Sequence, residues 1–436
     1  IIADGNRFMA IAKRGLVLGA AAIAVAGVIV TGAGLHLSQG KAFFEESPKE
    51  VIDEVWQLID NTYVDATFNQ TDWEAVRTDY LGREYSSQAA AYDAVREMLE
   101  LLEDPYTRFM DPQEFRNMQI DTSGELTGVG IQITQEEETD EIIVVAPIED
   151  TPAFEAGVRS KDVIVEIDGE STEGLELNDA VSLIRGPVGS DVTLTIRRDD
   201  ELIDFNLQRA RIEIHPVRYS IKEEPEGPIG YIRLTQFSSN AAGEMQEAIE
   251  SLEAENVVGY ILDLRSNPGG LLYSSIEIAR MWLDDGAIVS TVNRQGVVDE
   301  EVANNRAITD KPLVVLVDGG SASASEILSG ALQDNDRAQL VGTQTFGKGL
   351  VQSVRSLPDG SGVAITIAKY LTPSGRDINQ QGIDPDVLVE LSEEERESLA
   401  ENRDLIGTLE DPQYEQAQEL LLQTVQAEQN TAVGVQ

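Results

Sequence analysis

The hydrophobic positions follow a different rule in each of three successive parts of the chain. Over residues 46–120 they recur at helical spacing, and Ser47-Pro48-Lys49-Glu50 has the residue types of a helix N-cap and first turn. Over residues 124–213 they alternate in short segments between Gly, Pro and Asp turns, which is typical of β-strands. Over residues 214–391 apolar strands alternate with helices. This alternation predicts an α/β core with a mostly parallel central sheet.

We therefore expect a helical module without chemistry of its own, a compact β-domain of residues 124–213, and an α/β core. In the core, the pattern predicts helices over residues 241–254, 273–282 and 323–333. It predicts strands at Tyr231–Leu234, Val257–Leu264, Ile288–Val292 and Leu313–Val317.

Both ends of the chain depart from these patterns. Residues 392–436 are acidic and rich in Gln, and we expect a helical tail around Pro412–Ala427. At the other end, the run from Gly15 to Leu37 carries no formally charged side chain and follows three basic residues, Arg7, Lys13 and Arg14.

As a helix, this N-terminal run is long enough to cross a hydrocarbon layer of roughly 30 Å, and the preceding cations favour the cytoplasmic side. Residues 1–40 therefore predict a membrane anchor, with a cleaved signal peptide as the second interpretation and a buried core helix as the third. Either of the first two places the rest of the chain in a periplasm or a lumen.

Composition and charge exclude several classes of function. The 78 acidic residues outnumber the 32 basic ones, which gives a formal net charge of −46 and makes nucleic-acid binding very unfavourable. The absence of cysteine excludes disulfides, thiol nucleophiles and thiolate zinc sites, and we expect neither a metal nor a cofactor. The two histidines, His36 and His215, lie in the N-terminal apolar run and between two predicted domains. A Ser-His-Asp arrangement is therefore not expected.

The segment from Leu316 to Ile327 runs from a buried strand, through two glycines, into a helix that begins with tiny residues. Small side chains let a hydroxyl and backbone N–H groups approach a ligand closely, and a helix N-terminus favours developing negative charge. On its own, the sequence Ser321-Ala322-Ser323-Ala324-Ser325 fits a serine nucleophile and a Ser-rich N-cap equally well.

A serine nucleophile needs a base, and a lysine can serve when burial lowers its pKa. Lys348 is the best candidate because it follows the apolar strand Gln339–Val341 and has a glycine on each side. A surface lysine in a turn is the alternative. A third segment, Asp263-Leu264-Arg265-Ser266-Asn267-Pro268-Gly269-Gly270, ends a strand with a Gly-Gly turn. Its N–H groups could donate to an oxyanion, although the sequence is also simply a good turn.

Together and in this order, the three segments resemble the carboxyl-terminal processing peptidases, also called tail-specific proteases. The likeness covers residues 46–390, and the helical opening is most similar to cyanobacterial and chloroplast members. It implies a serine endopeptidase with an α/β protease core of the crotonase/Clp-like type and an inserted PDZ domain. Other matching motifs are Tyr63-Val64-Asp65, Asp72-Trp73, Asp104-Pro105-Tyr106-Thr107-Arg108-Phe109, Thr372-Pro373-Ser374-Gly375 and Gly382-Ile383-Asp384-Pro385-Asp386.

The resemblance also implies roles for individual residues. Ser323, the middle serine of its run, matches the family nucleophile, and Lys348, 25 residues later, matches the base. Gln352 matches the glutamine that holds the lysine, and Asp334 matches an aspartate that supports activity in some members. The implied oxyanion hole combines the N–H of Ala324 with that of one glycine, Gly269 being the first choice and Gly270 the second.

In the β-domain, Gly128, Val129, Gly130 and Ile131 resemble the loop with which PDZ domains capture a terminal carboxylate. A bound peptide would then add as a strand beside Ile131–Ile133. A β-domain without a ligand is the alternative. The same resemblance suggests that Arg185 contacts the active-site region.

The implied partners are protein substrates with free C-terminal tails, and a membrane through the N-terminal segment. A homo-oligomer is also compatible with the sequence. The C-terminal extension of a photosystem II reaction-centre precursor is one substrate that the resemblance suggests. Two rival functions remain: an acyl-CoA enzyme with a related α/β core, and a catalytically silent PDZ adaptor.

Overall fold

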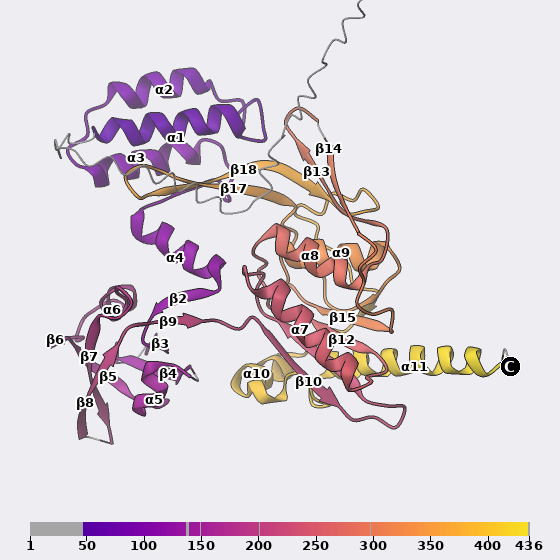
Figure 1. The fold of residues 1–436 in the computed structure, drawn as a ribbon. Helices are drawn as coiled ribbons and strands as arrows, with labels where there is room; N and C mark the ends of the chain where they lie inside the picture. The colour runs from indigo at the N-terminus through magenta and orange to yellow at the C-terminus, as the bar shows by residue number, and fades with distance from the viewer. Residues whose placement is uncertain (1–46, 137–138, 149, 200, 297, 435–436) are drawn as a thin grey trace, which may run out of the picture.

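The computed structural model describes residues 47–434 except 137–138, 149, 200 and 297 (Figure 1). The predicted membrane segment, residues 15–37, lies outside this range. Within the range, none of the helices is both long enough and apolar enough to cross a bilayer.

Three capped helices form the N-terminal module: α1 (Pro48–Thr62), α2 (Trp73–Gly82) and α3 (Gln88–Glu100). Side-chain oxygens of Ser47, Asp72 and Ser87 accept hydrogen bonds from the first turns, which satisfies N–H groups that have no partner within the helix. The buried faces of the helices pack together with Leu357, Val363 and Ile365 from the α/β core. The module therefore shares a hydrophobic core with a segment that follows it by more than two hundred residues.

This shared core continues into a second sheet. Strand β1 (Arg108–Met110) pairs with β18 (Gly362–Leu371), and β18 pairs in turn with β13 (Ala287–Asn293) and β17 (Leu350–Ser356). Strand β14 (Val298–Val302) completes the sheet. In Figure 1 the sheet lies between the helical module and the rest of the core. Residues 287–293 thus form the expected strand, but in this antiparallel sheet rather than in the parallel one.

The β-domain follows helix α4 (Pro112–Ser123) and lies apart from the other units in Figure 1. Strands β2 (Glu125–Gly128) and β9 (Ala210–Glu213) pair where the chain enters and leaves this domain. Its main sheet has the order β3-β4-β5-β7-β8, with β6 beside β5. The elements of this unit are β3 (Ile131–Gln135), β4 (Ile142–Pro147), α5 (Pro152–Ala156), β5 (Val163–Ile167), β6 (Glu170–Ser171), α6 (Leu177–Ile184), β7 (Asp191–Arg198) and β8 (Glu201–Gln208).

The central sheet of the core has the order β10-β11-β12-β15-β16-β19 and is parallel except for β10. Alternate residues of its inner strands face helices α7, α8 and α9 on one side and helix α11 on the other. Burial on both faces explains why these strands are continuous apolar runs. The elements are β10 (Val217–Lys222), β11 (Ile229–Leu234), α7 (Ala241–Ala254), β12 (Tyr260–Asp263), α8 (Leu272–Trp282), β15 (Leu313–Val317), α9 (Ala324–Asp334), β16 (Gln339–Gly342) and β19 (Val387–Leu388).

The C-terminal region is part of the packed core. It contains α10 (Glu393–Glu401), a short 3₁₀ turn (Arg403–Leu405) and α11 (Pro412–Gly434), so the tail helix is longer than predicted. Before α11, buried Asp411 and buried Asp263 each accept a 2.7 Å hydrogen bond from Arg265. Burial alone would raise the pKa of Asp263, but the Arg265 charge outweighs it and the pKa is lowered. The start of α11 is thereby fixed to the segment that leads into the Asn267–Gly270 turn.

Candidate active site

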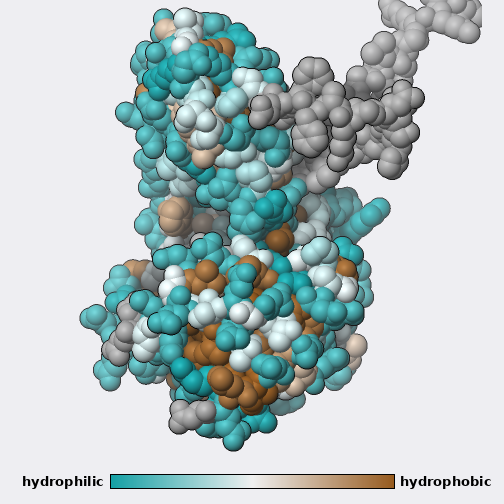
Figure 2. Space-filling model, turned by 90° about the vertical axis from the view of Figure 1, so that its left-hand side faces the viewer, coloured by the Kyte–Doolittle hydropathy of each residue, from teal (hydrophilic) through white to brown (hydrophobic). Residues whose placement is uncertain are grey.

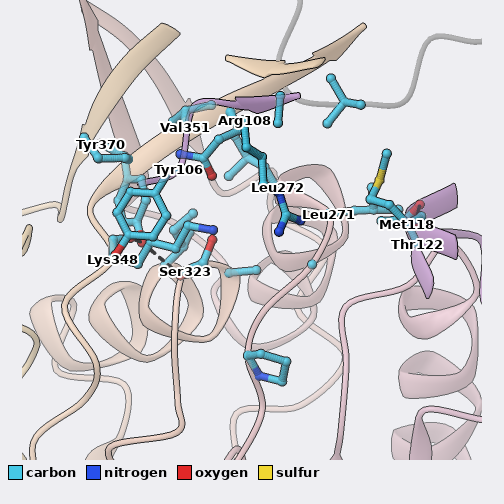
Figure 3. Close-up of a pocket in the computed structure, with 18 of the residues that line it drawn as sticks. Tyr106, Arg108, Met118, Thr122, Leu271, Leu272, Ser323, Lys348, Val351 and Tyr370 are labelled. Carbon is cyan, nitrogen blue, oxygen red and sulfur yellow. Dashed lines mark hydrogen bonds between the residues drawn. The ribbon is translucent and has the colours of Figure 1, made fainter. Parts of the chain in front are cut away.

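A cavity of about 300 Å³ opens where the carboxyl ends of β12 and β15 meet the second sheet (Figure 3). Open α/β sheets place their ligands at this edge. Ser323, Lys348, Gln352, Gly270 and Ala324 all line the cavity. Residues that lie far apart in the sequence are thus brought together as the resemblance implied.

Ser323 is the serine of its run that faces the cavity. It lies between β15 and α9 with φ 55° and ψ −111°, a conformation that is uncommon for a residue with a side chain. Its neighbours Ser321 and Ser325 are fully buried, and their hydroxyls donate 2.8 Å hydrogen bonds to the carbonyls of Leu264 and Asn267. The strained turn therefore exposes one hydroxyl and holds the other two in the core, as in the strand-turn-helix elbows that carry nucleophiles.

The Gly-Gly turn lies against this serine. At Gly269, φ is 100°, and a Cβ there would come within 2.6 Å of the Ala322 carbonyl oxygen, so the close approach requires glycine. The N–H of Gly269 donates a 2.9 Å hydrogen bond to Asn267 Oδ1. Among the described residues, the N–H groups of Gly270 and Ala324 have no such partner. Gly270 lines the cavity, whereas the N–H of Gly269 is engaged within the turn, so the structure favours the second-choice glycine as the candidate donor.

Lys348 enters the cavity from a loop in which both flanking glycines are sterically required. A Cβ on Gly347 would lie 2.9 Å from the Gly382 nitrogen, and one on Gly349 would lie 2.7 Å from the Asn379 nitrogen. Burial lowers the pKa of Lys348, and the positive charge of Arg108 lowers it further, whereas the carboxylates of Asp104 and Glu326 act in the opposite direction.

A buried carboxylate joins the serine turn to the lysine loop. Glu326, in the first turn of α9, is fully buried. Its Oε2 accepts hydrogen bonds from the N–H groups of Ser323 (2.8 Å) and Lys348 (2.9 Å). Its Oε1 accepts from the Thr345 hydroxyl (2.6 Å) and the Gly347 N–H (2.7 Å). One side chain therefore sets the distance between the two candidate reacting residues.

Two more side chains support this arrangement. The hydroxyl of Tyr370, on β18, lies within hydrogen-bond distance of the carbonyl oxygens of both Ser323 and Lys348. Gln352, on β17, lines the same cavity, and its buried Nε2 has no hydrogen-bond partner among the described residues. A buried amide without a partner is costly, so this donor is available to a neighbouring group or a bound peptide.

Asp334 lies away from the cavity. It is at the other end of α9 from Ser323, about 16 Å along the axis at 1.5 Å per residue. Its carboxylate accepts hydrogen bonds from the Ser374 N–H and from Arg376. Burial would raise its pKa, but bonds from Thr372 and Ser374 and the charge of Arg376 lower it. Asp334 therefore braces the turn at residues 372–375, and any support it gives to activity is indirect.

The PDZ-like loop lies in the β-domain, outside the cavity. Gly130 has φ 80°, and the Val129 and Gly130 carbonyls accept hydrogen bonds from the N–H groups of Ala153 and Ile148. Ile131 begins β3, an edge strand that pairs only with β4 among the described strands. An unpaired edge is what a peptide needs to add as a further strand.

Hydrophobic side chains also reach the surface of this unit, which occupies the lower part of Figure 2. They include Val145, Phe154 and Leu183. Beyond α6, Arg185 donates a 2.7 Å hydrogen bond to Asn117 on α4, the helix whose Met118 and Thr122 line the cavity. Arg185 therefore touches a cavity-lining helix rather than the cavity itself.

The helical module, which was expected to carry no chemistry of its own, supplies part of the cavity wall. Pro105, Tyr106, Arg108 and Met110 line the cavity, and Tyr106 lies beside Lys348 in Figure 3. The sequence contained one signal, the Asp104–Phe109 motif, which matched the family without suggesting a role. Pairing of β1 with β18 brings this motif to the site, and local sequence patterns do not report such a long-range contact.

Comparison with known proteins supports the same class of enzyme. Residues 228–389 match the model of peptidase family S41, residues 143–198 match a PDZ domain, and residues 44–100 match the tricorn protease C1 domain. A solved structure, the photosystem II D1 C-terminal processing protease, superimposes with a TM-score of 0.54 at 38% identity. It covers 79% of this chain and 93% of its own. The fold and the cavity thus define a serine peptidase with a PDZ domain.

Full-length relatives narrow the class further. The carboxyl-terminal-processing protease of Picosynechococcus sp. is 45% identical over 384 residues, which is 88% of this chain and 91% of the relative. The corresponding Synechocystis sp. protein is 47% identical over 352 residues, 80% of this chain and 82% of the relative. The chloroplastic carboxyl-terminal-processing peptidase 3 of Arabidopsis thaliana is 42% identical over 77% of this chain and 67% of its own. The chain belongs to the family of carboxyl-terminal processing serine proteases.

Glu326→Gln tests the role of the buried carboxylate. One orientation of the amide places its NH₂ group against the N–H groups of Ser323 and Lys348, so two hydrogen bonds are replaced by repulsive contacts. The other places it against the Gly347 N–H, which loses its hydrogen bond, and against the Thr345 hydroxyl, which can turn to accept. We expect kcat on a tailed peptide to fall about 10- to 100-fold through misplacement of the two loops. Glu395→Gln is the matched control because Glu395 occupies the same capping-box position in α10, at the surface. Equal kcat values for the two variants would contradict the assignment.

Proposed function

We propose that Ser323 is the nucleophile and Lys348 the general base of this carboxyl-terminal processing protease. The observation that carries the proposal is the choice of serine: of three in the run, Ser323 alone faces the cavity that Lys348 enters. The lowered pKa of Lys348 supports it, since a lysine must be neutral to accept a proton.

In the first step, neutral Lys348 Nζ takes the proton from Ser323 Oγ while Oγ bonds to the scissile carbonyl carbon. The N–H groups of Gly270 and Ala324 stabilise the negative charge that develops on the carbonyl oxygen, at roughly 3–4 kcal/mol per donor. The Lys348 ammonium then protonates the leaving nitrogen, and the peptide bond breaks to leave an acyl-enzyme. Water attacks this ester with Lys348 again accepting a proton, and Ser323 is regenerated.

Gln352 is proposed to hold the Lys348 amine or the substrate with its unpaired amide. The direction of the pH dependence follows from the base: kcat/KM rises with pH as Lys348 loses its proton. Because the pKa of Lys348 is lowered, kcat/KM rises at a lower pH than the titration of an ordinary lysine would give.

The two alternative functions fit these observations less well. An acyl-CoA enzyme has no use for a serine–lysine pair or a PDZ domain, and the relatives are named as processing proteases. A silent adaptor does not need two unpaired N–H groups in the same cavity as a half-buried lysine with a lowered pKa. The cavity therefore favours an active peptidase.

We also propose that the PDZ domain selects substrates by their C-terminus. Its edge strand β3 and the loop at residues 128–131 support this, as does the Arg185–Asn117 hydrogen bond that links the domain to a cavity-lining helix. One substrate of the right kind is a protein precursor with a C-terminal extension, because a similar solved structure is named for processing photosystem II D1. The proposed location is the lumenal or periplasmic side of a membrane, reached through the N-terminal apolar run.

Replacing either member of the proposed pair should abolish cleavage. We expect Ser323→Ala and Lys348→Met each to lower kcat on a tailed peptide about 10³-fold or more, with an unchanged circular dichroism spectrum. Lys369→Met is the matched control, since Lys369 lies on the adjacent strand β18 with an exposed side chain. Turnover at the wild-type rate in purified Ser323→Ala protein would remove the nucleophile assignment, and in Lys348→Met protein the base assignment.

Tail recognition is tested by a peptide with a free C-terminal carboxylate and the same peptide amidated. The loop's N–H groups can make charge-assisted hydrogen bonds only to the carboxylate, so amidation should reduce kcat/KM by about 10- to 150-fold. A variant lacking residues 124–213 provides the control. The Ile214 N–H donates a 2.8 Å hydrogen bond to the Gly124 carbonyl, so the chain enters and leaves the domain at neighbouring points and a short linker can join residues 123 and 214. This variant should cleave both peptides equally, whereas equal cleavage by the intact protein would defeat the proposal.

A further inference from the structure

The amine of Lys348 lies against an aromatic ring from the N-terminal module. Lys348 Nζ is 4.9 Å from the centroid of the Tyr106 ring. In Figure 3 the ring stands next to Lys348, close to Ser323 and Tyr370. Tyr106 comes from the loop between α3 and β1, more than two hundred residues before the lysine in the sequence.

The loop that carries Tyr106 is firmly held. The Asp104 carboxylate accepts hydrogen bonds from the Tyr106 N–H (3.0 Å) and the Thr107 hydroxyl (2.7 Å). Thr107 is buried, and its hydroxyl oxygen accepts a 3.0 Å hydrogen bond from the Thr366 N–H on β18. The next residue, Arg108, pairs with Ala364 in the register of β1 with β18. Tyr106 is thereby fixed to the strand that carries Tyr370.

We propose that Tyr106 is a positioning residue for the base of this protease. Its ring restrains the four-carbon lysine side chain, and its negative face stabilises the ammonium that forms when the amine takes the serine proton. This inference rests on the proposed role of Lys348. It gives the helical module a task in the reaction in addition to its structural one.

A ring suits this task better than a carboxylate would. A carboxylate directed at the amine would favour the ammonium strongly and keep the lysine protonated at rest, whereas a ring gives a smaller stabilisation. The charged and titratable groups around the amine are Arg108, Asp104, Glu326 and the phenols of Tyr106 and Tyr370. Asp104 and Glu326 are already bound by several donors within the protein.

Arg108 acts on the Lys348 amine in the opposite direction from the Tyr106 ring. Its guanidinium faces the cavity in Figure 3 and has no hydrogen bond or ion pair among the described residues. Its charge disfavours the lysine ammonium, while the Tyr106 ring favours it. Substitutions at the two positions should therefore move the lysine titration in opposite directions.

The test compares Tyr106→Phe, Tyr106→Leu and Arg108→Gln, through kcat, KM and the pH profile of kcat/KM on one tailed peptide. Tyr106→Phe keeps the ring, and the hydroxyl has no hydrogen bond among the described residues, so kcat should stay within about 2-fold of wild type. Tyr106→Leu should lower kcat about 3- to 30-fold, by more than any change in KM, and shift the rise of kcat/KM to lower pH. Arg108→Gln should shift that rise to higher pH.

Tyr85→Leu is the control for loss of a tyrosine ring from the same module, because Tyr85 does not line the cavity. It should lower the melting temperature without moving the pH profile. The inference is overturned if Tyr106→Leu retains the wild-type kcat and pH profile, or if Tyr106→Phe is as impaired as Tyr106→Leu. Should Tyr106→Leu fail to fold, Tyr106→Gln, which also removes the ring, is measured in its place, and a wild-type kcat and pH profile in that variant overturns the inference.

Lys348→Met measured in parallel distinguishes a failure of the Tyr106 role from a failure of the proposed base. If Lys348→Met loses turnover while Tyr106→Leu is unchanged, only the role of Tyr106 fails. If Lys348→Met retains turnover, the proposed base itself is wrong.

Discussion

The arrangement of the cavity depends on one buried carboxylate that connects two loops. Glu326 accepts four hydrogen bonds. One oxygen accepts from the backbone N–H groups of Ser323 and Lys348, and the other accepts from the Thr345 hydroxyl and the Gly347 N–H. A buried charge is tolerated only when it is well bonded, so the two loops must stay where their donors reach it. Because Ser323 and Lys348 come from these loops, their proximity follows from satisfying Glu326 rather than from a direct contact between them.

The same cavity also depends on a strand that joins three distant parts of the chain. Strand β18 pairs with β1 of the helical module and with β17, which carries Gln352, and it supplies Tyr370. Tyr370 approaches the carbonyls of both Ser323 and Lys348, and the module that pairs with β18 brings Tyr106 to the lysine amine. The helical module is therefore continuous with the candidate active site, whereas the β-domain reaches it through α4.

The sequence was most informative where structure is decided locally. Helix Ala241–Ala254 and strand Leu313–Val317 coincide with the predicted ranges, because periodicity and burial on both faces leave clear patterns. The strand-Gly-Ser-helix order and the glycines beside Lys348 also mark sites where close packing is required. Family resemblance then implied which serine and which lysine to pair.

What the sequence missed depends on distant contacts. The choice between the two candidate donor glycines depends on the Asn267 side chain, which accepts a hydrogen bond from the Gly269 N–H. Asp334 lies on the same helix as Ser323 but at its other end, and chain separation alone did not show that it faces the turn at residues 372–375. Tyr106 reaches the lysine only through the β1–β18 pairing, and the acidic tail packs on the sheet through apolar residues of α11.

In the proposed mechanism, the backbone turn presents one serine of three as the nucleophile near a lysine whose pKa is lowered. Labelling the intact protein with a fluorophosphonate, followed by peptide mapping by mass spectrometry, tests it directly, because Ser321, Ser323 and Ser325 lie in one stretch of sequence and can be told apart by fragmentation. We expect a single adduct on Ser323, with a labelling rate that falls sharply in Lys348→Met. An adduct on Ser321 or Ser325, or labelling of Ser323 at the same rate without Lys348, would contradict it.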